Sequence, residues 1–241
     1  MFVAQTNSTN TLLKELIATG NPPEFIYAGY QTAGRGQTGN SWESEENKNL
    51  LCSILLPPRK NLFELNVVTS VAVHKALSEL GISELAIKWP NDIYRQDKKV
   101  AGILIENAIV GNEVKYSIAG IGLNVNQTEW FSSAPNPISL KQITGKEYDI
   151  ETLMQRLLDE VRKALQEDVW DYYKAHLYRR EGYWPFVERE VDTTPTMNAS
   201  AQTPGAFMAR IRDVLQTGEI VLEDKQGKQR KYHFKQIRYI L

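Results

Sequence analysis

The sequence predicts an α+β fold in which a mixed-sheet domain, residues 1–185, precedes a small all-β domain, residues 186–241. Three observations lead to this prediction. Short apolar strand patterns alternate with helical patterns through the first domain. A segment rich in Thr, Pro, Ser and Ala follows at 191–205. Closely spaced alternating strands with polar turns come after it and indicate a small β-barrel.

The first half of the chain predicts helices separated by short strands. Between Thr9 and Thr19, leucine and isoleucine recur at helical spacing, and Gly20-Asn21-Pro22-Pro23 ends the helix. Leu62–Leu80 shows the same spacing and stops at Gly81. Strands are predicted at Phe25–Tyr30, Leu50–Leu56 and Leu85–Trp89.

The second half predicts a hairpin, a long helix and the barrel strands. Lys99–Asn107 and Glu113–Val125 form the hairpin, which turns at Gly111-Asn112. Ile150 to about Tyr178 is predicted to be one long helix with leucines on one face. The barrel strands are predicted at Phe207–Val214, Ile220–Leu222 and Tyr232–Ile240.

Composition excludes several classes of protein. The formal net charge of -1 gives no reason to expect a nucleic-acid or membrane surface. No apolar run approaches the roughly 20 residues that cross a bilayer, and the start lacks a signal-peptide pattern. Cys52 is the single cysteine, so we expect a buried thiol in a cytoplasmic protein without an internal disulfide. The three histidines show no metal-ligand spacing, and we expect no metal held by the protein.

A glycine-rich loop with one fixed positive charge is the first candidate for chemistry. Gly34, Gly36 and Gly39 match the dinucleotide-binding spacing, but no helix follows them, so that interpretation fails. The stretch 31–49 is long for an irregular segment, and long loops often bind ligands. An ordinary surface loop is the alternative. Arg35 between two glycines favours an anion site.

A second cluster, Lys88-Trp89-Pro90-Asn91-Asp92, ends a short apolar strand. A plain strand end followed by a turn is the alternative interpretation. Strand alternation places Lys88 on the same face as Ala86, where a lysine is costly to bury unless it meets an anion. Gly120 and Gly122 end another apolar strand and allow close approach to the backbone.

These motifs, taken in order, resemble those of biotin protein ligases. The matching segments are Ser8-Thr9-Asn10, Gln31, Gly34-Arg35-Gly36, Trp42, Lys88–Asp92, Lys99–Leu104 and Gly120–Asn124. The resemblance implies a mixed-sheet catalytic domain and an SH3-like C-terminal domain. It implies that biotin and Mg-bound ATP form biotinyl-5′-AMP, and that a lysine of a biotin carboxyl carrier domain then accepts the biotin.

The resemblance also implies roles for particular residues. Arg35, Lys88 and Asp92 would be catalytic, with the two cations stabilising phosphate charge and Asp92 assisting deprotonation of the acceptor lysine. The residues expected at biotin are Ser8, Thr9, Asn10, Gln31, Gly34, Arg35, Gly36, Lys88 and Gly102. Those expected at ATP are Arg35, Gly36, Gln37, Trp42, Lys88, Asn91, Lys99 and Asn124. The glycine loop is expected to order over the ligand.

Two departures and two alternatives remain. The family loop commonly reads Gly-Arg-Gly-Arg-x-Gly-Arg, whereas Gln37 and Asn40 stand at its second and third arginine positions here.

We expect no DNA-binding domain, because the Ser8-Thr9-Asn10 motif starts almost at the first residue. A homodimer is possible through a strand edge. A lipoate ligase, or a non-catalytic binder of biotin or its adenylate, would share these features.

Overall fold

The structure is a computed structural model that describes residues 1–37, 40–131, 136–189 and 205–241. Thr38 and Gly39 of the predicted loop, and nearly all of the predicted segment 191–205, lie outside the described residues. Within those ranges, no helix is both long enough and apolar enough to span a bilayer.

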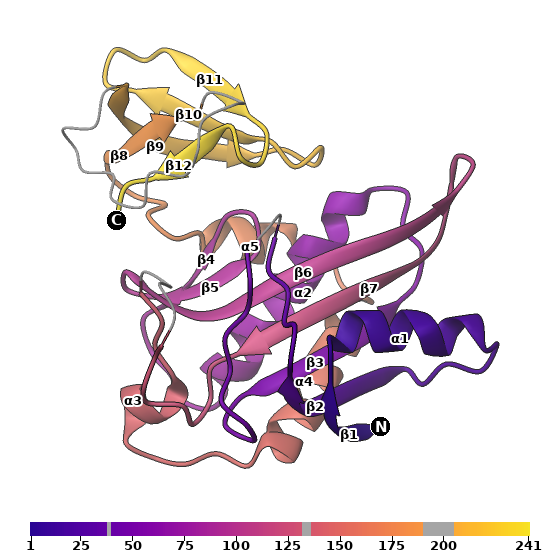
Figure 1. Ribbon diagram of the computed structural model, residues 1–241. Helices are drawn as coiled ribbons and strands as arrows, with labels where there is room; N and C mark the ends of the chain where they lie inside the picture. The colour runs from indigo at the N-terminus through magenta and orange to yellow at the C-terminus, as the bar shows by residue number, and fades with distance from the viewer. Residues whose placement is uncertain (38–39, 132–135, 190–204) are drawn as a thin grey trace.

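A seven-stranded sheet in the order β1-β2-β3-β7-β6-β5-β4 forms the centre of the larger domain (Figure 1). Its strands are β1 (Phe2–Thr6), β2 (Phe25–Gln31), β3 (Leu50–Leu56), β4 (Leu85–Lys88), β5 (Asp92–Arg95), β6 (Lys98–Val110) and β7 (Glu113–Leu123). β1 runs parallel to β2, and every other neighbouring pair is antiparallel. The predicted hairpin at Gly111-Asn112 is confirmed, and it joins β6 to β7.

The two faces of this sheet differ in how much side chain they carry. On one face Cys52 of β3 pairs with Ile121 of β7, and both are almost fully buried. On the other face Ser53 is opposite Gly120, and Gly102 of β6 is opposite Gly122. Because side chains alternate along a strand, the sheet is crowded on one face, and on the other face it is bare around these small residues.

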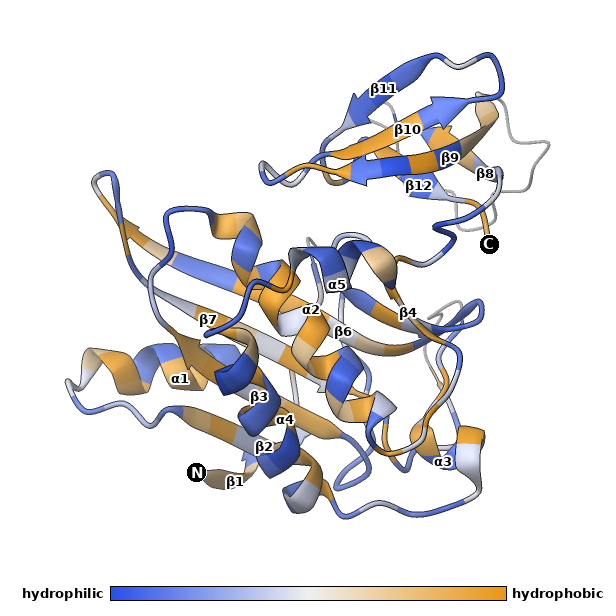
Figure 2. Cartoon of the chain, turned by 180° about the vertical axis from the view of Figure 1, so that it is seen from behind, coloured by the Kyte–Doolittle hydropathy of each residue, from blue (hydrophilic) through white to orange (hydrophobic). Residues whose placement is uncertain are grey.

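The crowded face is covered by helices. In the view from behind, α2 (Leu62–Ser78) and α4 (Ile150–Ala164) lie across the sheet (Figure 2). Their apolar residues join the main core with the strands. Cys52 belongs to this core, where burial raises the pKa of its thiol to about 12. The expected buried thiol is therefore present.

The bare face is covered only in part, by α1 (Thr9–Ala18). Leu13 of this helix packs on Ile26 and Ile118, and all three are fully buried in a small cluster of their own. This packing fixes the start of α1, residues 8–10, beside Gly120 of β7, which Asn10 approaches closely.

The C-terminal domain is a five-stranded antiparallel sheet in the order β11-β10-β9-β8-β12. Its strands are β8 (Trp184–Glu188), β9 (Ala206–Val214), β10 (Ile220–Asp224), β11 (Gln229–Tyr232) and β12 (Ile237–Tyr239). It contacts the larger domain where Trp89 Nε1 donates to the carbonyl of Gly218 at 3.1 Å. The Trp89 ring also lies 6.0 Å from the ring of Phe234. The predicted α+β class is thereby confirmed.

Several predicted elements differ from the structure. The single helix 150–178 is wrong, because the chain forms α4 and then a short α5 (Trp170–Ala175). The Asp168 carboxylate accepts from the amide of Trp170, the first residue of the second helix. The chain after α5 then pairs with β4, since Ile87 donates to the carbonyl of His176.

Other elements were missed or merged. The predicted strand Tyr232–Ile240 contains only the last residue of β11 and then β12, because the chain turns near Lys235, whose φ is 76°. The sequence analysis missed β1, β5, β8 and the short α3 (Leu140–Thr144). β1 and β5 are only 5 and 4 residues long, and such short strands carry little periodicity.

We predict that Leu13→Ala lowers the free energy of unfolding by about 2–5 kcal/mol, the usual cost of a cavity at a fully buried leucine. Because Leu13 anchors α1, the substitution should also weaken ligand binding at residues 8–10. Urea denaturation followed by circular dichroism measures the first effect. Substitution of Leu12 on the same helix, which is only partly buried at the edge of this cluster, is the control, and an equal loss there would contradict the prediction.

Candidate functional site

A cavity of about 970 Å³ lies against the bare face of the sheet. The start of α1 and the glycine-rich loop form one side, and β4, β5 and the start of β6 form the other. Residues of the C-terminal domain close it from above. These are Arg189, Phe234, Lys235, Ile237, Arg238, Tyr239 and Leu241.

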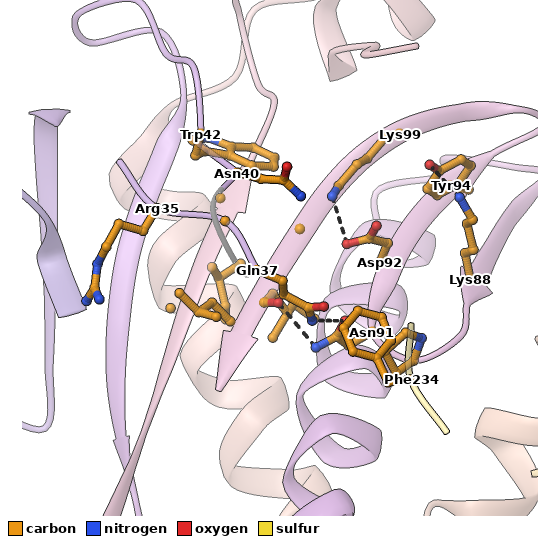
Figure 3. Close-up of a pocket in the computed structure, with 18 of the residues that line it drawn as sticks. Arg35, Gln37, Asn40, Trp42, Lys88, Asn91, Asp92, Tyr94, Lys99 and Phe234 are labelled. Atoms are coloured by element: carbon orange, nitrogen blue, oxygen red, sulfur yellow. Dashed lines mark hydrogen bonds and ion pairs between the residues drawn. The ribbon is translucent and has the colours of Figure 1, made fainter. Parts of the chain in front are cut away.

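The floor of the cavity is made of glycines, and Trp42 lies on it. A Cβ atom at Gly122 would stand 2.3 Å from Trp42 Cε2, and one at Gly102 would stand 2.8 Å from Trp42 Cζ3. Neither position therefore has room for a side chain. Figure 3 shows the indole reaching from the loop across the strands. The ring is a flat apolar surface suited to a planar ligand group.

The wall beside α1 is a chain of short polar groups. The Thr9 amide and hydroxyl both donate to Gln31 Oε1, at 2.8 and 3.1 Å. The Ser53 hydroxyl donates to Thr9 Oγ1 at 2.8 Å and lies 2.5 Å from Asn10 Oδ1. All but Gln31 are almost fully buried. This wall can offer hydrogen bonds without adding charge.

Lys88 lies on the opposite side, in a largely apolar setting. Its Nζ donates to the Tyr94 hydroxyl at 3.0 Å and stands 4.4 and 5.3 Å from the ring centroids of Tyr94 and Tyr239. Burial lowers the pKa of Lys88 to about 8, against the opposing effect of the nearby Asp92 carboxylate. An anion beside this ammonium would offset the cost of burying its charge.

Asp92 and Lys99 form an ion pair in the same region, with Lys99 Nζ 2.8 Å from Asp92 Oδ1 (Figure 3). Lys99 also stands 5.5 Å from the Trp42 ring centroid. Asp92 therefore already has a partner within the cavity.

Arg35 lines the same cavity but points away from Lys88 (Figure 3). Its guanidinium donates to both carboxylate oxygens of Glu106, at 3.2 and 2.9 Å. The two cations expected to meet on one phosphate thus share a cavity, yet they do not converge in this arrangement.

Gln37 fastens the loop to the other side of the cavity. Its Nε2 donates to Asn91 Oδ1 at 2.9 Å, and Asn91 in turn donates to Asn66 and to the carbonyl of Ile103. A neutral hydrogen bond occupies a position where the family loop commonly has arginine.

The cavity gathers most of the predicted site residues. Those on its wall are Ser8, Thr9, Asn10, Gln31, Arg35, Gly36, Gln37, Trp42, Lys88, Asn91, Asp92, Lys99 and Gly102. Gly34 and Asn124 do not line it. Asn124 is 2 % exposed and donates to the carbonyl of Lys99 at 3.2 Å, so it supports the wall from behind. Gly34 packs against the carbonyl of Trp42, where a Cβ would stand at 2.6 Å.

Glu106, Tyr94 and the residues from the C-terminal domain were not among the predicted site residues. Glu106 could have been found from the sequence. Strand alternation puts it on the same face as Gly102 and Leu104, and an acidic residue in an otherwise apolar strand suggests a site. Nothing local marked Tyr239 or Phe234, which reach the site only through domain packing. Among the described residues, no group of three or more His, Cys, Asp or Glu side chains could hold a metal.

Comparison with known proteins gives a family and several relatives. The model of the biotin/lipoate A/B protein ligase family matches residues 2–124. The bifunctional ligase/repressor BirA of Escherichia coli K12 is 31% identical over 76% of this chain, which spans 55% of that protein. The biotin–[acetyl-CoA-carboxylase] ligase of Paracoccus denitrificans is 31% identical, with 95% of both chains covered.

A solved structure shows the same overall arrangement. The biotin protein ligase of Aquifex aeolicus, in complex with biotin and ATP, superposes with a TM-score of 0.77 at 25% identity. The match covers 99% of this chain and 98% of that one. Both the large sheet and the C-terminal sheet fall within the matched length.

We predict that anion binding at Lys88 weakens as pH rises through about 8, because only the protonated amine attracts the anion. With biotin as the probe, the affinity should fall by up to about tenfold per pH unit above that value, the limit for one linked proton. Binding at pH 8 should also take up protons. Calorimetry in two buffers of different ionisation enthalpy measures both effects.

Lys88→Ala is the control for this prediction. It removes the titrating group, so the affinity should become weak and independent of pH between 7 and 9.5 (about the range in which the shifted lysine titrates). An unchanged pH dependence in this variant would assign the effect to another group.

Proposed function

Because this chain belongs to the biotin/lipoate A/B protein ligase family, we propose that it is an ATP-dependent biotin protein ligase. The observation that carries the proposal is the cavity that joins a polar wall, a glycine floor and two cationic side chains. The neutral wall can recognise the uncharged ring of the vitamin. The cationic side chains beside it can meet the vitamin carboxylate and the nucleotide phosphate.

The polar wall suits the ureido ring of biotin. The carbonyl of Gln31 accepts from Thr9, so its amide nitrogen is the atom that it can offer to a ligand carbonyl. Ser8, Thr9 and Asn10 present further donors and acceptors at the start of α1. A lipoyl chain has no matching polar head, which favours biotin over lipoate.

In the first step, a biotin carboxylate oxygen attacks the α-phosphorus of ATP. The bond from that phosphorus to the bridging oxygen breaks, and pyrophosphate leaves with biotinyl-5′-AMP formed. Negative charge gathers on the non-bridging oxygens, and we take Lys88 and Arg35 as the cations that stabilise it, Arg35 after it has left Glu106. Trp42 offers its ring to the adenine. Mg²⁺ would be held mainly by the phosphates and water, with Asp92 within the same cavity.

In the second step, the amine of a lysine on a biotin carboxyl carrier domain attacks the acyl carbon of the mixed anhydride. An amide bond forms, and AMP leaves. The proton of the amine passes to a base, and Asp92 is our candidate, at the cost of loosening its ion pair with Lys99. The division into domains at residue 185 and a homodimer remain predictions, and β8 starts close to that boundary, at Trp184.

A transfer assay tests this proposal directly. The purified protein, ATP, Mg²⁺ and a biotin carboxyl carrier domain are incubated with either biotin or lipoate, and the carrier is weighed by intact mass spectrometry. Modification with biotin alone is the expected result. Modification with lipoate would make the protein a lipoate ligase, and binding of biotin without pyrophosphate release would make it a non-catalytic binder.

We predict that Arg35→Ala nearly abolishes pyrophosphate release, since the variant loses a phosphate contact and the loop's bond to β6. Pyrophosphate is measured by a coupled phosphatase assay with biotin and ATP saturating. Arg95→Ala removes an arginine outside the cavity and is the control. Release at the wild-type rate would rule out a catalytic role for Arg35.

We predict that Lys88→Ala raises the barrier of adenylate formation by about 2–4 kcal/mol, the usual loss for one transition-state donor. Single-turnover kinetics measures this step separately from transfer to the carrier. If the variant changed only the dissociation constant of biotin, Lys88 would be a binding residue without a role in the transition state.

A further inference from the structure

Arg35, which lines the cavity, is bound to Glu106 of β6. The guanidinium makes a two-pronged contact with the carboxylate, at 3.2 and 2.9 Å, and one of its nitrogens also reaches Thr11 at 3.3 Å. The Arg35 side chain is 44% exposed and that of Glu106 is 22% exposed. Glu106 is thus the better buried partner, and Arg35 is the one that can move.

Glu106 is itself held in place by other groups. Asn10 Nδ2 donates to its Oε2 at 2.7 Å, and Lys14 Nζ stands 3.8 Å from its Oε1. The Ser53 hydroxyl donates to Asn10 Oδ1, and the Asn10 side chain packs on Gly120. A Cβ atom at Gly120 would stand 2.4 Å from Asn10 Oδ1. The carboxylate is therefore a rigid part of the polar wall beside α1.

The geometry makes two positions of Arg35 mutually exclusive. Figure 3 shows Arg35 on one side of the cavity and Lys88 on the other, with Gln37 between them. A planar guanidinium that gives one fork to Glu106 cannot give the same fork to a phosphate beside Lys88. Arg35 must leave Glu106 before the two cations can act on one phosphate group.

We propose that Glu106 is a positioning residue that competes with the nucleotide phosphate for Arg35. It holds the guanidinium against α1 and releases it when a triphosphate offers a stronger partner. This rests on the proposed function, because it takes ATP to be the ligand. Part of the binding energy of the nucleotide is spent on breaking the ion pair, and a carboxylate at this position therefore weakens ATP binding.

The rival interpretation is that the Arg35–Glu106 pair is permanent and only supports the biotin wall. The two interpretations differ in sign. If the pair must break, removing the charge of Glu106 strengthens ATP binding. If the pair persists, the same change weakens the binding of ATP and of biotin together.

The test uses Glu106→Gln, which keeps the shape and one accepting oxygen. Glu113→Gln at the far end of the same hairpin is the control, because it removes the same charge from an exposed site paired with Lys115. ATP is titrated into each full-length protein by calorimetry. We expect the dissociation constant to fall about two- to five-fold in Glu106→Gln, the range for a half-exposed ion pair, and to stay unchanged in the control.

A second readout needs no nucleotide. The amides of Gly36 and Trp42 are hydrogen-bonded within the loop, to Asn40 and Gly34. Their hydrogen exchange, followed in the protein alone, should be faster in Glu106→Gln and unchanged in the control. Glu106→Asp, which keeps the carboxylate, should restore much of the protection.

Competition for Arg35 and the binding of ATP itself predict different results in these experiments. Faster exchange with tighter ATP binding supports the competition. Unchanged or weaker ATP binding in Glu106→Gln, in a background where the wild type binds ATP, overturns it. If the wild type binds no ATP at all, the proposed function falls, and unchanged exchange would show that Glu106 does not hold the loop either.

Discussion

The absence of side chains at three positions of the sheet is the constraint on which the site depends. Gly102, Gly120 and Gly122 let Trp42 and Asn10 approach the backbone of β6 and β7 to distances that a Cβ would forbid. The same strands carry Ile103 and Ile121 on their other face, where they are buried against the helices. One pair of strands therefore provides both the core of the domain and an open floor.

Charge in the site is controlled by what surrounds it. Lys88 is enclosed by Tyr94 from β5 and by Tyr239 from the C-terminal domain, and this burial lowers its pKa. Trp89, the next residue, bonds to Gly218 of that same domain. The C-terminal domain thus helps to set the protonation state of a lysine in the larger domain, and the way that the domains pack is part of the chemistry.

The sequence alone predicted the elements whose signals are local. The hairpin turn at Gly111-Asn112 has its own turn chemistry, and the helix of 9–18 has its own apolar stripe. The resemblance then selected residues such as Thr9, Gln31 and Lys88, which the fold brings to one cavity. The break after α4 could not be predicted, because no Gly or Pro marks it and pairing with Ile87 decides where α5 ends. The partners of Arg35 and Lys88 were hidden for the same reason, since Glu106 and Tyr239 lie far away in the sequence.

The glycine floor has a consequence for changing the substrate range. A residue without a side chain cannot be made smaller, so no substitution at Gly102 or Gly122 can widen the pocket for a bulkier vitamin analogue. Extra space would have to come from side chains that line the pocket, such as Trp42 or those at the start of α1. Directed evolution toward larger substrates would therefore have to trade away aromatic contact, and a methyl group added at Gly102 or Gly122 would push the Trp42 ring off the strands.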